Sequence, residues 1–213
     1  AVAGTGVTTG FTPGVQCSQV RFSDNTALYT AGAIYTQAIA LEVVESVLDG
    51  NKAYAASVET RNAGGGAVYI HGAPADTVRF INCTFSDNDV AVRNQQAAAS
   101  SKFSRGRACM HLEAAERTTG GALWLAATTG VLVSNCTFHD NVACLGGAIA
   151  TMGGAVSIMD SHFTSNAGML NAGGVFGNDA AVNVSGCSFA NNIANMGGGL
   201  YVESRAGWTC AWI

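Results

Sequence analysis

Charged residues are scarce in this chain of 213 residues, because Asp, Glu, Lys and Arg together make up 11%, against about 25% in ordinary soluble domains. A fold with so few charges and with 27 glycines needs a tightly stacked interior that is rich in backbone. The net charge of −4 argues against nucleic acid or an anionic membrane as the main partner. No apolar run reaches the roughly 18 residues of a membrane-spanning helix, so the sequence predicts no membrane span.

No signal peptide is visible in the first residues, AVAGTGVTTG, because they lack a charged start and an apolar core. We expect a single domain over residues 1–213. Because the chain begins without Met, we expect it to be a mature form or, as we favour, a fragment of a longer chain. None of the seven cysteines forms a C-x-x-C pair, which disfavours zinc and thioredoxin-like sites, and we expect no metal and no cofactor. The odd number of cysteines leaves at least one thiol free or bonded to another chain.

Two short motifs alternate six times along the chain. One is a Gly-Gly or Ala-Gly step followed by an apolar residue, and it begins at Ala31, Gly65, Gly120, Gly146, Ala172 and Gly197. The other is F-x-x-N, with Leu48 replacing Phe once, and it ends at Asn25, Asn51, Asn88, Asn141, Asn166 and Asn192. The step from Asn25 to Asn51 is 26 residues and that from Asn141 to Asn166 is 25, a period typical of a solenoid. The longer steps contain insertions, a short one near residues 54–62 and a long one at about 91–119.

Within each repeat the apolar residues follow a period of two in short pieces. In VRFINCTF, Val78 and Phe80 alternate with polar residues, the phase slips at residues 81–82, and Cys83 and Phe85 resume the inward face. Such a slip indicates a corner between two strands, and the Gly-Gly step precedes a third strand. Three short strands per turn of about 25 residues predict an all-β parallel β-helix of about six coils, with its repeats at about 17–203.

Coils stacked about 4.8 Å apart bring equivalent side chains into contact. We therefore expect an Asn ladder from the six F-x-x-N turns, an interior Phe column with Leu48, and a second apolar column. The second column contains Ile34, Val68, Leu123, Ile149, Val175 and Leu200. We also expect Cys83, Cys136 and Cys187 to be buried free thiols, because stacked Cβ atoms are slightly too far apart for an unstrained disulfide. A Cys109–Cys144 bridge is an open alternative that would tie down the long insertion.

The pairing of GGA-[ILV] with F-x-x-N resembles the repeat of chlamydial polymorphic membrane proteins and of related right-handed, pectin-lyase-like β-helix proteins. The resemblance covers about Cys17 to Glu203. It implies a right-handed parallel β-helix solenoid with one long insertion loop. In that family such repeats form the surface-exposed passenger of an autotransporter, so the resemblance also implies a structural or adhesive role.

An aromatic row is the first candidate binding surface. If the column from Ile34 to Leu200 faces inwards, the residues that follow its members face outwards, and five of these six are aromatic: Tyr35, Tyr69, Trp124, Phe176 and Tyr201. An exposed aromatic row suits stacking on sugar rings or docking of a protein. The alternative is that turns or the insertion cover the rings, or that aromatic residues simply favour strands.

The long insertion and three Asn-x-Ser/Thr triplets are further candidates. The insertion is basic, with Arg93, Lys102, Arg105 and Arg107, and it either docks an acidic partner or packs locally. The triplets begin at Asn82, Asn135 and Asn183 and match the N-glycosylation pattern. They favour a secretory route and an extracellular or cell-surface location.

Catalysis is the main functional alternative, since parallel β-helices also include polysaccharide lyases and hydrolases. Those reactions need clustered carboxylates or a basic residue that abstracts a proton. The acidic residues here are scattered over turns, as at Asp24, Asp49, Asp87 and Asp140, and the sequence has no Asp-Asp, Gly-His-Gly or Arg-x-Lys cluster. We therefore predict a non-catalytic module that binds protein or glycan. The alternatives are a carbohydrate-active enzyme and a structural subunit of a large assembly, which would be intracellular.

Overall fold

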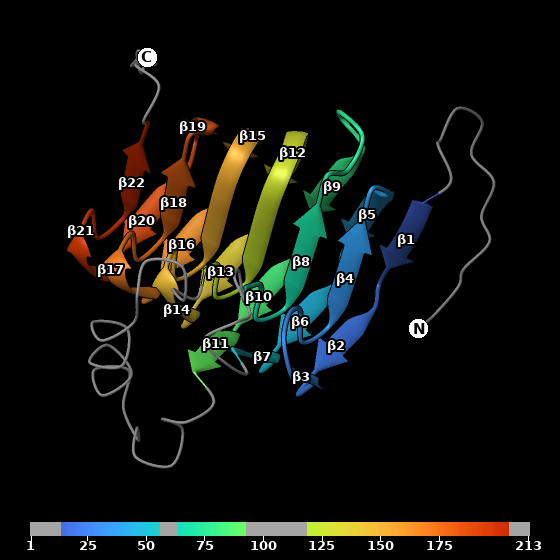
Figure 1. Ribbon diagram of the computed structural model, residues 1–213, viewed down its shortest axis with the longest axis horizontal. Coiled ribbons are helices and arrows are strands. Elements are labelled where there is room, and N and C mark those ends of the chain that lie inside the picture. The colour runs from blue at the N-terminus through green and yellow to red at the C-terminus, as the bar shows by residue number, and fades with distance from the viewer. Residues whose placement is uncertain (1–13, 56–63, 93–118, 205–213) are drawn as a thin grey trace.

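The computed structural model describes residues 14–55, 64–92 and 119–204, and its regular elements there are all β-strands. The strands form three sheets in which every pair is parallel, and the chain winds through the three sheets in turn (Figure 1). The fold is a right-handed parallel β-helix, as predicted from the sequence. Sheets B and C each contain six strands, one for every predicted coil.

Sheet A has ten strands. They are β1 (Gly14–Ser18), β4 (Ile34–Gln37), β5 (Ala40–Val44), β8 (Val68–His71), β9 (Val78–Ile81), β12 (Leu123–Ser134), β15 (Ile149–Met159), β18 (Val175–Asn178), β19 (Ala181–Ser185) and β22 (Leu200–Glu203).

Sheets B and C are built from shorter strands. Sheet B contains β2 (Arg21–Ser23), β6 (Val47–Asp49), β10 (Thr84–Ser86), β13 (Thr137–His139), β16 (His162–Thr164) and β20 (Ser188–Ala190). Sheet C contains β3 (Thr26–Ala27), β7 (Lys52–Ala55), β11 (Asp89–Val92), β14 (Val142–Leu145), β17 (Ala167–Asn171) and β21 (Ile193–Met196).

The predicted division of each coil into strands needs one correction. The corner predicted at residues 81–82 is present, with Asn82 at φ 54°. However, the strand after the Gly-Gly step and the V-x-V strand both belong to sheet A, and they merge into one strand in β12 and in β15. The third sheet is instead sheet C, whose strands follow the ladder Asn, and the sequence patterns did not predict them.

The Asn ladder is present along the whole stack. In each of the first five coils the Asn Nδ2 donates to the Oδ1 of the Asn in the next coil, over 2.8–3.0 Å. The backbone N–H of the same Asn donates to that Oδ1 as well, over 3.0–3.2 Å. The Nδ2 group also donates to the carbonyl oxygen of the Phe or Leu in the preceding coil, over 2.8–3.0 Å. Buried polar backbone at this corner is therefore satisfied by one repeated side chain.

The Phe column lies beside the Asn ladder. Phe85, Phe138, Phe163 and Phe189 stack with ring centroids 4.7–4.8 Å apart and interplanar angles of 5° or less. Leu48 occupies the equivalent position between Phe22 and Phe85. The second predicted column, from Ile34 to Leu200, is also in register. These columns form the main core.

Thiols and hydroxyls share a third row at the corner between sheets A and B, in the order Ser46, Cys83, Cys136, Ser161 and Cys187. The backbone N–H of Val20 donates to the Ser46 Oγ and that of Cys136 donates to the Ser161 Oγ, both over 3.1 Å. Cys83 and Cys136 are buried and Cys187, in the last coil, is half-buried; all three are free thiols, as expected. A hydrogen bond to Cys83, together with burial, raises the pKa of Cys136.

Cysteine pairing and the insertion fall partly outside the described residues. Cys144 is disulfide-bonded. Cys109, the partner that the sequence left as an open alternative, lies outside the described residues, as do residues 93–118 of the long insertion.

One glycine position explains the Gly-Gly step. Gly121 lies so close to the next coil that a Cβ there would collide with the carbonyl oxygen of Gly147. Glycine is therefore required for the backbones of adjacent coils to approach at this corner.

Candidate binding surfaces

The predicted aromatic row exists as a column of register partners. Tyr35 pairs with Tyr69, Tyr69 with Trp124, and Phe176 with Tyr201, while Ala150 separates Trp124 from Phe176. The Tyr35 and Tyr69 rings stack with centroids 5.3 Å apart, and those of Phe176 and Tyr201 stack at 5.9 Å.

The expected exposure of this row is wrong for three of its five rings. Tyr69, Trp124 and Phe176 have exposed fractions of 9%, 1% and 1%. They form a second hydrophobic cluster with residues at the start of the glycine steps, namely Ala31 and Ala172, which begin two of the steps, and Leu145, which precedes Gly146. These residues fold over the rings, which is the alternative that the sequence left open.

Two rings of the row remain accessible, and they lie at opposite ends of the molecule. Tyr35 is 54% exposed on β4 and Tyr201 is half-buried on β22, and these are the two edge strands of this part of sheet A. Because only these two end rings are accessible, a single copy of the chain does not present a continuous aromatic face. Burial of the Tyr69 hydroxyl, opposed in part by the nearby Trp124, raises its pKa.

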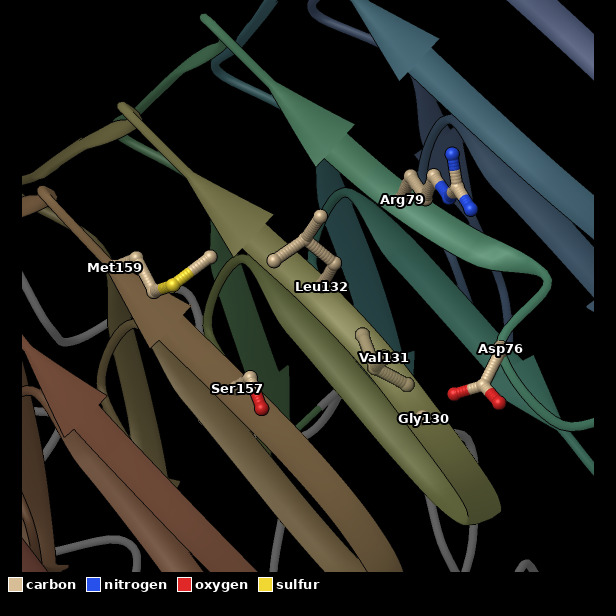
Figure 2. A pocket seen from close by; sticks show the side chains of 7 residues that line it. All are labelled: Asp76, Arg79, Gly130, Val131, Leu132, Ser157 and Met159. Atoms are coloured by element: carbon tan, nitrogen blue, oxygen red, sulfur yellow. The ribbon is translucent and has the colours of Figure 1, made fainter.

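A groove on the outer face of sheet A was not predicted from the sequence. Its volume is about 370 Å³, and it is lined by Asp76, Arg79, Gly130, Val131, Leu132, Ser157 and Met159. Figure 2 shows Asp76 and Arg79 along one margin, Ser157 and Met159 along the other, and Leu132 between them. The floor arises because Arg79, Leu132 and Ser157 are register partners on β9, β12 and β15.

The wall of the groove depends on the turn before β9. The Asp76 N–H donates to the Thr129 carbonyl over 3.2 Å, and a Cβ at Gly130 would collide with the Asp76 carboxylate. Glycine at position 130 thus allows the turn to lie against β12. Within the described residues neither Asp76 nor Arg79 forms an ion pair, so both charges are available to a ligand. The sequence signal for this wall was the extra turn HGAPADT within one repeat.

The three glycosylation candidates are all exposed. Asn82 and Asn135 occupy the same left-handed corner in adjacent coils, and the Asn135 Nδ2 donates to the Asn82 Oδ1 over 2.7 Å. Asn183 lies on β19 opposite Ser157. The basic candidates Arg93, Lys102, Arg105 and Arg107 lie outside the described residues.

Within residues 14–55, 64–92 and 119–204, no group of three or more His, Cys, Asp or Glu residues is arranged to hold a metal ion. No helix among these residues is long and apolar enough to cross a membrane.

The architecture and its inner ladders define a parallel β-helix protein. The family described as the right handed beta helix region matches residues 46–209, and the chain belongs to this family. The Chlamydia polymorphic membrane protein repeat matches residues 19–37, and this similarity suggests a surface-exposed or outer-membrane protein. Neither match indicates catalysis. No curated protein and no solved structure gives a significant match to the chain.

Proposed function

We propose that this chain is a non-catalytic, surface-exposed β-helix module that binds a protein or glycan partner on the outer face of sheet A. The observation that carries the proposal is the groove, because it combines apolar side chains on a regular sheet with two charges, Asp76 and Arg79, that form no ion pair with another described residue. Its volume of about 370 Å³ lies within the range typical of small-ligand sites, about 300–1,000 Å³. A sugar unit or a short peptide segment fits this size and this mixture of groups.

The remaining candidates extend the proposed surface. Tyr35 offers a ring for stacking at one end of the solenoid. The basic insertion with Arg93, Lys102, Arg105 and Arg107 is proposed to dock an acidic partner. Glycans at Asn82, Asn135 and Asn183 would accompany an extracellular or cell-surface location. Mass spectrometry of the natural protein, with and without glycosidase, would detect them.

The experiment compares two groove variants with one matched control. Arg79→Glu and Leu132→Asp change the margin and the floor of the groove, whereas Lys52→Glu makes the same charge change as Arg79→Glu on an exposed residue of sheet C. Binding is measured on glycan arrays and on cells that bind the wild-type protein. We expect about a tenfold or larger loss for the groove variants, as for central contact residues, and no loss for Lys52→Glu. If Tyr35→Ala alone abolishes binding, the aromatic end and not the groove carries the function.

A carbohydrate-active enzyme is the second candidate, because a carboxylate and a guanidinium at one margin of a groove are groups that acid–base catalysis can use. Incubation with acidic and neutral polysaccharides, followed by assay of new reducing ends and of unsaturated products, tests it. Product formation that Asp76→Asn abolishes would support the enzyme and overturn the non-catalytic assignment.

A further inference from the structure

The lining of the groove on sheet A includes one sulfur atom, the thioether of Met159. Met159 is the last residue of β15, and it is 37% exposed although its strand is paired on both sides. Figure 2 shows the end of its side chain directed toward Leu132, across the groove from Asp76 and Arg79. A ligand that fills the groove therefore contacts this thioether.

The neighbours of Met159 explain why its side chain is exposed. Its register partners on the two adjacent strands are Ser134 on β12 and Ser185 on β19. Serine is too short to cover the longer methionine side chain, so the thioether stands above the sheet surface. Earlier coils carry Val44 and Ile81 in the same row. The row thus accepts apolar side chains without sulfur, and the thioether is what distinguishes Met159 from them.

An exposed thioether reacts with peroxides by a two-electron oxidation. The Met159 sulfur attacks one oxygen of hydrogen peroxide, the O–O bond breaks, and a new S–O bond forms. The second oxygen leaves as hydroxide and takes the proton of the first, so that the products are the sulfoxide and water. Methionine sulfoxide reductases reverse the oxidation. The thiols of Cys83 and Cys136 are buried beneath the sheets and are shielded from the oxidant.

Oxidation changes the margin of the groove from apolar to polar. Methionine is a flexible apolar side chain, whereas its sulfoxide is polar and chiral. The added oxygen lies beside Leu132, where it replaces an apolar contact with the ligand. Burying that oxygen under a ligand costs free energy unless the ligand provides a hydrogen-bond donor.

We propose that Met159 is a reversible redox modification site, and that its oxidation weakens binding in the groove. This inference rests on the proposed function, because it needs a ligand that occupies the groove. It adds a control to that function: a peroxide releases the partner, and a methionine sulfoxide reductase restores binding.

Met152 provides an internal control on the same strand. It is 40% exposed, close to the 37% of Met159, but it does not line the groove. Its register partners are Ala126 and Asn178. Hydrogen peroxide therefore reaches both thioethers, and only their positions relative to the groove differ.

The test measures binding before and after treatment with hydrogen peroxide for wild type, Met159→Leu and Met152→Leu. The probes are a glycan array and cells that bind the untreated wild-type protein. Peptide mass spectrometry quantifies the sulfoxide at each methionine, and circular dichroism confirms that the fold is retained. Met159→Gln places a polar amide at the margin without any oxidant, and Met152→Gln is its matched control.

We expect peroxide to weaken binding about tenfold or more in wild type and in Met152→Leu. Treatment with methionine sulfoxide reductase and dithiothreitol should restore it. Met159→Leu should show the same affinity before and after peroxide, whatever that affinity is. Without oxidant, Met159→Gln should bind about tenfold more weakly than Met152→Gln.

Three results would overturn the inference and leave the proposed function intact. They are unchanged binding by wild type whose Met159 is fully oxidised, an equal loss in Met159→Leu after peroxide, and a Met159 that stays unoxidised while Met152 is converted. If the untreated wild-type protein binds neither a glycan nor a cell, the proposed function fails and the inference fails with it.

Discussion

The Asn ladder leads to a quantitative prediction for Asn141→Ala. The Asn141 side chain is fully buried in the middle of the stack. Its Oδ1 accepts from the Asn88 N–H at 3.1 Å and from the Asn88 Nδ2 at 3.0 Å. Its Nδ2 donates to the Asn166 Oδ1 at 2.9 Å and to the Phe85 carbonyl at 3.0 Å. Alanine removes all four hydrogen bonds.

Two buried donors then lose their partner inside the protein: the Asn88 N–H and one Asn88 Nδ2 hydrogen. The Asn166 Oδ1 keeps the backbone N–H of residue 141, which still donates to it at 3.1 Å. A buried group left without a hydrogen bond costs about 1–3 kcal/mol. We therefore expect Asn141→Ala to lower the free energy of unfolding by about 2 kcal/mol or more, a substantial fraction of the about 5–15 kcal/mol of a typical domain.

Asn25→Ala is the matched control, because Asn25 belongs to the same ladder but is exposed in the first coil. Alanine there removes only the Nδ2 bond to the Asn51 Oδ1, and the backbone N–H still donates to that oxygen. The expected loss is about 0.5–1.5 kcal/mol. Urea unfolding followed by circular dichroism gives both values. Equal losses for the two variants would refute the assignment of stability to buried ladder bonds.

Two further predictions concern the coil spacing and the thiols. Gly121→Ala should prevent folding into soluble protein, because its Cβ would collide with the Gly147 carbonyl. The Cβ of Gly72→Ala meets nothing within 4 Å, so this variant should lose only the about 1–2 kcal/mol that a left-handed alanine costs. Expression and thermal melts distinguish the two variants. Burial raises the pKa of Cys187 from 9.0, so iodoacetamide should modify this thiol more slowly in the native protein than in the unfolded chain, with a rate that still climbs above pH 9.0. Cys83 and Cys136 should stay unmodified until the protein unfolds, and mass spectrometry of alkylated peptides would contradict this if it found either one modified early.

The inner columns could be predicted from the sequence because each coil repeats the same physical requirement. The Asn ladder, the Phe column and the column from Ile34 to Leu200 all depend on one residue per coil at a fixed place in the motif. Sheet C could not be predicted because its strands lack a shared pattern: β7 reads KAYA, β14 reads VACL and β17 reads AGMLN. Their strand conformation comes from pairing with the neighbouring coils and not from local alternation.

The surface was harder to predict than the core. Alternation along the strand correctly predicted that the side chain of Trp124 points away from the main core. The alternation carries no information on which residues cover that side chain. Leu145 covers this region from a different strand, and only the three-dimensional path of the chain brings the two together. The groove was missed for a similar reason, since Arg79 and Leu132 are direct neighbours across the sheet although they are 53 positions apart in the sequence.

Outward positions of sheet A follow a different rule from the inner columns. The register position that contains Arg79, Leu132 and Ser157 is occupied in the flanking coils by Gln16, Glu42 and Asn183, so no residue type repeats in this row. Because these side chains meet solvent, the coil spacing does not restrict them. Substitutions in this row should therefore change binding while leaving the free energy of unfolding within about 0.5 kcal/mol of wild type, whereas substitutions in the inner columns should do the reverse. The repeat determines where the proposed binding surface can lie, and we expect the residues that depart from the repeat to determine its ligand.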